Sequence, residues 1–316
     1  DSLSLNTVHM PHPLEAYLKK HPQFDRRNVD KELAASPVVL FIHGLGGQMS
    51  QFEPLMGLLS QCLEIHALDL PGFGGTKLEF IESHKSITTI LAQDKQDILR
   101  SVSRMNWTDF TTDNLVHIIH QYVSQTISEN KKLVIIGHSM GTHLAVKLTN
   151  LLEDLRVEGL ILLSPPAFIK DIELKSDIDS IDPPLSQNQV VAAAHRHPFI
   201  VKLFSYFPFI FNSFRVWDRI NGLNSTSVLR QLVPQTDTFN KVRQFRWNLD
   251  VDTRIVLKYF YGFRRATYSD LCGAISKFNN NVEDKKTYIK TLIITGGEDR
   301  VTPSKHIFEL EKFVNA

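Results

Sequence analysis

The 316-residue sequence lacks most of the features that identify a class of protein by composition alone. Charge of one sign is missing, because 35 basic and 34 acidic side chains leave a formal net charge of +1. Such a balance offers no strong field to attract nucleic acid or an acidic partner. Internal repeats and low-complexity tracts are also missing, which excludes repeat arrays and composition-driven linkers. We therefore expect a globular protein that does not bind nucleic acid.

Cysteine is scarce as well, since Cys62 and Cys272 are the only two and are not in C-x-x-C spacing. This usage fits a reducing compartment and favours an intracellular location, in the cytoplasm or an organelle, although one disulfide between them stays open. No apolar run indicates a transmembrane helix, because Lys202, Pro208 and Arg215 interrupt the most apolar stretch.

The most informative motif that is present is Gly-His-Ser-Met-Gly at residues 137–141. It stands between an apolar run, residues 133–136, and a helix-compatible run, residues 142–152. A strand, a sharp turn and a helix form the context of a nucleophile elbow, in which the flanking glycines let a serine hydroxyl project from the sheet. We predict that Ser139 is a nucleophile, and the alternative is a structural turn in an unrelated α/β fold.

A second motif, His-Gly-Leu-Gly-Gly at residues 43–47, directly follows the apolar run 37–42. Three glycines in four positions allow the backbone to turn its amides inward, and acyl transfer needs two donors for the oxygen that becomes negative. We assign these oxyanion-hole donors to the backbone amides of Leu45 and Met140. A glycine-rich turn without this role is the alternative.

Three residues of these motifs are expected to line the substrate pocket, namely His43, Gly44 and His138. We expect the two imidazoles to tune the loop by hydrogen bonding rather than to act as the general base.

A candidate acid follows the apolar run 291–295. Asp299 is the acid that we predict, because open α/β sheets gather functional groups at the carboxyl ends of their strands. Glu298 competes with it in the same turn. Capping of a helix that begins near Pro303 is the structural alternative for this pair.

On these three motifs the sequence resembles the α/β-hydrolase superfamily, in particular its serine esterases, lipases and thioesterases. Residues 65–75 and 160–166 are similar to two further strands and turns of the family, so five strands fall in the family's order. The resemblance implies a mostly parallel, doubly wound α/β sheet with an inserted, mainly helical cap. It implies a first core part at 1–165, the cap at 166–285 and a second core part at 286–316.

The chain departs from the family pattern at its catalytic histidine, which normally follows the acid after one more helix and strand. This sequence stops at Ala316, 17 residues past Asp299, and His306 stands inside the predicted helix, a poor position for a base. The sequence also begins at Asp1 without a methionine. We therefore expect a piece of a longer polypeptide, with the triad histidine beyond residue 316.

The predicted cap contains an aromatic segment, residues 198–217, that is rich in phenylalanine. We predict a hydrophobic roof over the nucleophile that accepts an acyl chain or touches a membrane surface, with Phe204, Phe207 and Phe211 as pocket residues. The alternative is that these rings form the core of the cap itself.

The sequence thus predicts a serine hydrolase of a small-molecule or lipid ester or thioester, with no metal and no organic cofactor. An acyltransferase that uses the same acyl-enzyme and a binding protein that retains the fold without turnover stay open, as does the oligomeric state. Two apparent metal motifs are set aside. Residues 177–182 lack the glycine of a calcium loop, and His195 and His197 have no further ligand nearby.

Overall fold

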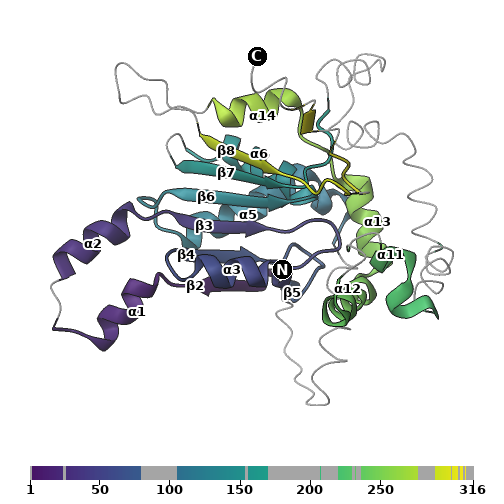
Figure 1. The fold of residues 1–316 in the computed structure, drawn as a ribbon. Coiled ribbons are helices and arrows are strands. Elements are labelled where there is room, and N and C mark those ends of the chain that lie inside the picture. The colour runs from purple at the N-terminus through teal and green to yellow at the C-terminus, as the bar shows by residue number, and fades with distance from the viewer. Residues whose placement is uncertain are drawn as a thin grey trace.

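A central sheet of six strands organises the computed structural model (Figure 1). The structure describes residues 2–23, 26–79, 105–153, 156–169, 207, 220–229, 232, 236–276, 289–299, 301–304, 307–308 and 310. The strand order is β2-β4-β3-β6-β7-β8. Their bounds are β2 Thr7–Met10, β3 Val38–Ile42, β4 Glu64–Leu68, β6 Leu133–His138, β7 Val157–Leu163 and β8 Lys290–Ile294. A separate two-stranded sheet pairs β1 Ser2–Ser4 with β5 Lys77–Glu79.

All strands of the central sheet except β2 run parallel to one another. They are the five strands predicted from the apolar runs, which are typical of strands covered on both faces. In β3 every residue is buried. The prediction of a mostly parallel α/β sheet is confirmed.

The sheet separates two hydrophobic layers, because side chains alternate between its faces. Val38, Leu40 and Ile42 face the layer of α5 Thr112–Thr126 and α6 Met140–Leu151. Val39 and Phe41 face the layer of η1 Met49–Phe52 and α3 Glu53–Leu59. Helices on both faces make the sheet doubly wound, as predicted.

Residues 1–35, in which no apolar run predicted a strand, contain the edge strand β2. β2 pairs antiparallel with β4, whereas α1 Pro13–Lys20 and α2 Arg26–Ala35 project from the end of the sheet opposite the cap helices (Figure 1). β2 alternates between exposed and half-buried positions and carries no apolar run, so its sequence gave little strand signal.

The long connection over residues 76–110 is buried at both of its described ends. Thr76 is buried, and Phe110, in η2 Trp107–Phe110, is fully buried against Tyr259 of α13. Residues 80–104, the middle of that stretch, lie outside the described residues.

The described part of the predicted cap is helical. It contains η3 Gly222–Asn224, α11 Thr226–Leu229, α12 Thr238–Asp250, α13 Thr253–Gly262 and α14 Tyr268–Ile275. α13 and α14 share the main hydrophobic core through Tyr259 and Leu271, and α14 lies along α6. The boundaries at 166 and 285 stay a prediction.

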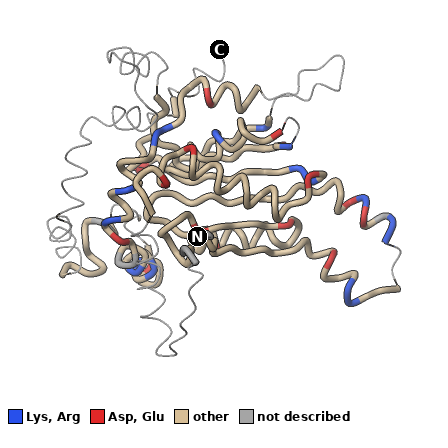
Figure 2. The backbone as a smooth tube through the Cα atoms, turned by 180° about the vertical axis from the view of Figure 1, so that it is seen from behind, with Lys and Arg blue, Asp and Glu red and all other residues tan. Residues whose placement is uncertain are grey.

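Basic and acidic residues are interspersed along the described backbone, and the strands of the central sheet carry few of them (Figure 2). None of the helices in the described ranges combines the length and the hydropathy needed to cross a membrane. Cys62 and Cys272 are both free thiols on the surface.

Candidate active site

Ser139 occupies the sharp turn between β6 and α6 in a strained conformation. Its φ of 51° and ψ of −121° lie in a region that residues with a side chain rarely adopt. The turn is held from both sides. The Ser139 amide donates to the Leu163 carbonyl at 2.8 Å, and its carbonyl accepts from the amide and hydroxyl of Thr142 at 2.9 and 2.6 Å. The surrounding backbone therefore imposes the position of the serine.

The two glycines of the elbow are required by close backbone contacts. A Cβ on Gly137 would lie 2.5 Å from the carbonyl oxygen of Gly141, and a Cβ on Gly141 would lie 2.3 Å from that of Ile42. No side chain fits at these distances. The start of α6 is thus packed directly on the ends of β3 and β6.

The glycine-rich loop lies beside the serine. A Cβ on Gly44 would be only 2.9 Å from the Cβ of Ser139. The loop turns back at Gly46, whose φ is 69°, and the Gly47 amide donates to the Gly44 carbonyl at 3.0 Å. The sequence placed these two motifs about a hundred residues apart, and the parallel pairing of β3 with β6 brings them together.

The two amides assigned to the oxyanion hole belong to the residues that follow Gly44 and Ser139, which are in close contact. Met140 is the first residue of α6, so its N–H has no acceptor within the helix. Within the described chain, neither the Met140 amide nor the Leu45 amide donates a backbone hydrogen bond. Both are thus compatible with a role as donors to a substrate oxygen.

His43 is a buried clamp of this loop. Its Nδ1 lies 2.7 Å from the Gly44 carbonyl oxygen, and its Nε2 accepts from the Leu70 amide at 2.8 Å. The proton is therefore on Nδ1, and the ring is neutral. Burial lowers the pKa of His43, although Asp69 and the bond to Gly44 oppose the shift. Both ring nitrogens are engaged, which argues for positioning of the loop and against a role as base.

His138 precedes the serine and packs edge-on against Phe52, with ring centroids 6.3 Å apart. Burial lowers the pKa of His138, and His43 adds to this shift whereas Asp299 opposes it. Among the described residues, His138 is the alternative candidate for the general base, because it is a neutral imidazole next to Ser139 in the chain.

Asp69, to which the sequence analysis gave no role, ties the surrounding loops together. Its buried carboxylate accepts from the Met49 amide at 2.8 Å, from the Gly75 amide at 3.0 Å and from the Asn6 side chain at 2.6 Å. An acidic residue at the end of the apolar run that forms β4, just before Pro71 and a glycine-rich turn, was the signal that could have indicated it.

Strand β8 is parallel to β6 and β7, so the three strands end at the same edge of the sheet (Figure 1). Asp299 follows the end of β8 by five residues. One carboxylate oxygen accepts from the amides of Val301 and Thr302 at 2.8 and 2.9 Å, and the other accepts from the Thr302 hydroxyl at 2.6 Å. Burial would raise the pKa of Asp299, but these bonds and one from Ser164 outweigh it and lower the pKa below its usual value. The carboxylate is therefore ionised at neutral pH, and it also caps the following turn.

The cap helices are attached to the loops of the site, which the sequence did not indicate. The hydroxyl of Tyr259, in α13, donates to the Pro71 carbonyl at 2.9 Å, and its ring packs on Phe73, which contacts His43. A Cβ on Gly46 would touch Val251, just after α12. Residues of the predicted cap thus support the loop that carries Leu45.

Of the three predicted roof residues, only Phe207 is described, and its side chain is 45% exposed. Phe204 and Phe211 lie outside the described residues, as do His306 and the two motifs set aside as metal sites. The roof over the serine stays a prediction.

Comparison with known proteins identifies the family of this chain. The model of the alpha/beta hydrolase family matches residues 39–313. Lipid droplet hydrolase 1 of Saccharomyces cerevisiae is 24% identical over 311 residues, which cover 90% of this chain and 68% of the yeast protein. An abhydrolase domain-containing protein of Schizosaccharomyces pombe is 25% identical over 230 residues, 72% of this chain and 51% of that protein. The chain thus spans about half the length of the second relative.

Solved structures show the same fold. An esterase from Exiguobacterium antarcticum superposes with a TM-score of 0.53 at 12% identity, covering 99% of this chain and 84% of the esterase. An epoxide hydrolase from hot-environment metagenomes gives 0.52 at 15% identity, with the same coverage of 99% and 84%. At such identities the likeness shows the fold alone, whereas the family model covers most of the sequence. The chain belongs to the alpha/beta hydrolase family, and this membership supports a hydrolase.

Proposed function

We propose that this protein is a serine hydrolase that cleaves a carboxylic ester or thioester through an acyl-enzyme on Ser139. The observation that supports it best is the forced geometry of the elbow. A serine at φ 51° lies against Gly44, with the Leu45 and Met140 amides beside it. Ser164, after β7, also has a positive φ, but the strain of Ser139 is combined with close contact to a glycine-rich loop, which a structural turn would not need.

In the proposed reaction the Ser139 hydroxyl attacks the substrate carbonyl, and the Leu45 and Met140 amides bind the resulting oxyanion. A histidine, which the family pattern implies, removes the serine proton and later donates a proton to the leaving group. Asp299 orients this histidine and stabilises its imidazolium, and the low pKa of the carboxylate keeps it charged for that role. Water then attacks the acyl-enzyme, and an alcohol in place of water would make the protein an acyltransferase. None of these steps uses a metal or an organic cofactor.

The hydrolysis of p-nitrophenyl esters by the full-length protein tests this proposal. We expect Ser139→Ala to reduce kcat by several orders of magnitude. Ser124→Ala, on the exposed side of α5, is the matched control and should retain wild-type activity. Full activity of Ser139→Ala would refute the acyl-enzyme, and a comparable loss on His138→Ala alone would move the base to His138.

We further propose that the substrate is a lipid ester and that the cap region contacts a lipid surface. One relative is named a lipid droplet hydrolase. In this chain, large apolar side chains of α11 and α12 are exposed to solvent, namely Leu229, Phe239 and Val242, and Lys241 and Arg246 lie among them on α12. Apolar side chains beside basic ones fit an interface that carries anionic lipid.

Flotation with vesicles of phosphatidylcholine and phosphatidylserine tests the lipid contact. Phe239, 71% exposed, should account for roughly 1.5–3 kcal/mol of insertion, so Phe239→Asp should weaken binding by about tenfold or more. Phe308→Asp is the control, because that ring is 64% exposed outside the cap helices. Equal binding of wild type and Phe239→Asp would refute this surface while leaving the serine chemistry untouched.

A further inference from the structure

Three potential metal ligands share one face of the sheet at the edge remote from Ser139. Strands β2 and β4 are antiparallel, and their register places His9 directly opposite His66. Glu64 lies two residues before His66, so its side chain is on the same face as that of His66. Glu64 also begins β4, whereas Ser139 follows the end of the parallel strand β6. The cluster is therefore separate from the proposed active site.

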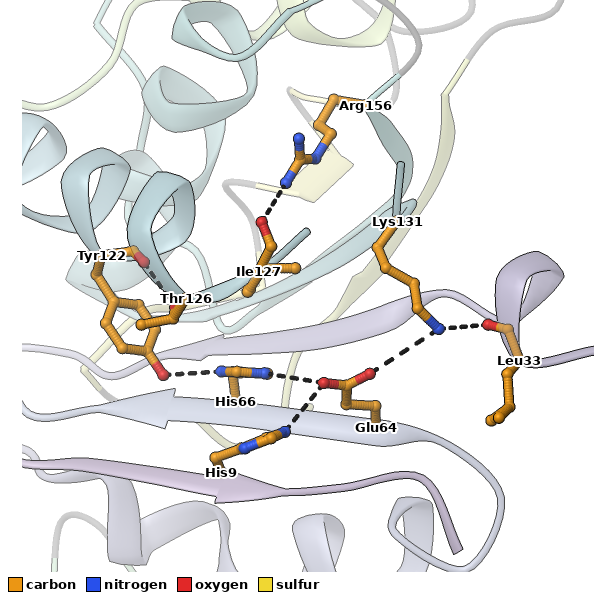
Figure 3. A network of polar contacts seen from close by, with 9 residues as sticks. All are labelled: His9, Leu33, Glu64, His66, Tyr122, Thr126, Ile127, Lys131 and Arg156. Atoms are coloured by element: carbon orange, nitrogen blue, oxygen red, sulfur yellow. Dashed lines mark hydrogen bonds and ion pairs between the residues drawn. The ribbon is translucent and has the colours of Figure 1, made fainter. Parts of the chain in front are cut away.

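The ligating atoms of the three side chains converge on one point (Figure 3). Glu64 Oε1 lies 2.9 Å from His9 Nε2 and 3.3 Å from His66 Nε2, and all the potential ligand atoms lie within 4.8 Å of one another. The two imidazoles are stacked, with centroids 4.3 Å apart and planes 24° from parallel. Two ring nitrogens and one carboxylate oxygen are thus already gathered by the strand pairing.

The second nitrogen of His66 is held by a partner from another element. Its Nδ1 lies 2.8 Å from the hydroxyl oxygen of Tyr122, in the middle of α5. When Nδ1–H donates to this oxygen, the lone pair of Nε2 points at a carboxylate oxygen, and only a proton or a cation can bridge the two acceptors. A hydrogen bond to the outer nitrogen is also how metal-binding histidines are commonly oriented.

We propose that His9, Glu64 and His66 form a binding site for a divalent transition-metal ion of the Zn²⁺ class. Two imidazoles and one carboxylate suit zinc, whereas calcium and magnesium prefer ligand sets made of oxygen alone. Lys131 Nζ lies 3.9 Å from the other oxygen of Glu64, which leaves Oε1 to bind the ion through one atom. The cluster is absent from the sequence analysis because His9 is 55 positions from Glu64 and belongs to the unpredicted strand β2.

The burial of the three side chains suits both retention and entry of an ion. His66 is 2% exposed and Glu64 16%, whereas His9 is 51% exposed and opens the site to solvent. Water would complete the coordination on that side. The ion would join the edge strand β2 to β4, so its role is to stabilise the edge of the sheet rather than to take part in ester cleavage.

Titration of the metal-free protein with Zn²⁺ in competition with a chromophoric chelator tests the site. We expect one equivalent to bind and to raise Tm, and Mg²⁺ to have no effect. His9→Ala and Glu64→Gln should abolish both, and Tyr122→Phe should weaken Zn²⁺ binding by about 10–100-fold. His117→Ala, at an exposed position of α5, is the control and should bind as wild type.

Two results would overturn the proposal: wild type that binds no more Zn²⁺ than His9→Ala, or full binding retained by Glu64→Gln. Because His9 is largely exposed, His9→Ala is expected to fold, and its near-native Tm without metal verifies this. Esterase activity is a separate measurement, and we expect it to be equal in wild type and His9→Ala.

Discussion

Asp299 has two candidate roles, to cap the turn that follows it and to orient a catalytic histidine. Replacement by Asn separates them, because it preserves the capping hydrogen bonds and removes the charge. The asparagine oxygen can still accept from the Val301 and Thr302 amides, and the Thr302 hydroxyl can rotate to accept from the new NH₂ group. Asn and Asp are about equally good caps, so the loss of stability should stay below ~1 kcal/mol, or about 2–4 °C in Tm. If Asp299 is the partner of a catalytic histidine, its replacement by Asn should instead lower kcat by ~10³–10⁴-fold, with KM nearly constant.

The assay is p-nitrophenyl ester hydrolysis by the full-length protein, with thermal unfolding of the same samples. Glu298→Gln is the control, since Glu298 is exposed in the same turn, and its effect on kcat should be mild. A loss of kcat in Asp299→Asn that is no larger than in Glu298→Gln would refute Asp299 as the acid of the triad. Its role would then be limited to capping the turn at Val301 and Thr302.

The depressed pKa of Asp299 also predicts a dependence of stability on pH. Its stabilising contribution is present above the unfolded-state pKa of about 4 and is lost as the pH falls through the lower folded-state value. Asp299→Asn should lack this acid-induced loss, which urea denaturation at pH 6 and at pH 3 measures.

Three further predictions concern the elbow, the roof and His143, a fully buried histidine of α6. Gly141→Ala should abolish activity or folding, because its Cβ would lie 2.3 Å from the Ile42 carbonyl oxygen, whereas Gly57→Ala, with nothing within 4 Å, should be neutral or stabilising in a Tm measurement. Burial lowers the pKa of His143 to about 3, so up to ~5 kcal/mol of unfolding free energy should be lost as the pH falls from about 6.5 towards 3, and His143→Gln should flatten that profile in urea titrations. If Phe204, Phe207 and Phe211 line an acyl tunnel, kcat/KM should rise about fourfold per buried CH₂ along a series of p-nitrophenyl esters. Alanine at one of these rings or more should flatten the rise and leave acetate hydrolysis intact, whereas a profile that peaks at acetate and ignores all three changes would contradict the roof.

The fold could be predicted from the sequence wherever long apolar runs or the spacing of glycines specify it. Strands β3 and β6 are buried on both faces, so their sequences are continuous apolar runs, which are typical of central parallel strands. At Gly141 the close contact with the Ile42 carbonyl admits only glycine. The edge strand β2 left no such run, because half of its positions face solvent and its pairing with β4 is a long-range contact.

The candidate site was predictable where one short segment contains all of the geometry, and elsewhere it was not. The strained turn at Ser139 is local, so the five-residue motif 137–141 is enough to predict it. The bond from Tyr259 to Pro71 joins positions 188 residues apart, and no local pattern encodes it. Asp299 stayed ambiguous for a physical reason, since the same carboxylate hydrogen bonds that cap a turn also keep an acid ionised.

Covalent labelling tests the central claim most directly. The full-length protein is treated with a fluorophosphonate, and the modified peptide is identified by mass spectrometry. We predict one adduct per molecule, on the Ser139 hydroxyl, with no labelling of Ser139→Ala and full labelling of Ser124→Ala. An adduct on another residue, or undiminished labelling of Ser139→Ala, would contradict the assignment of Ser139 as the nucleophile.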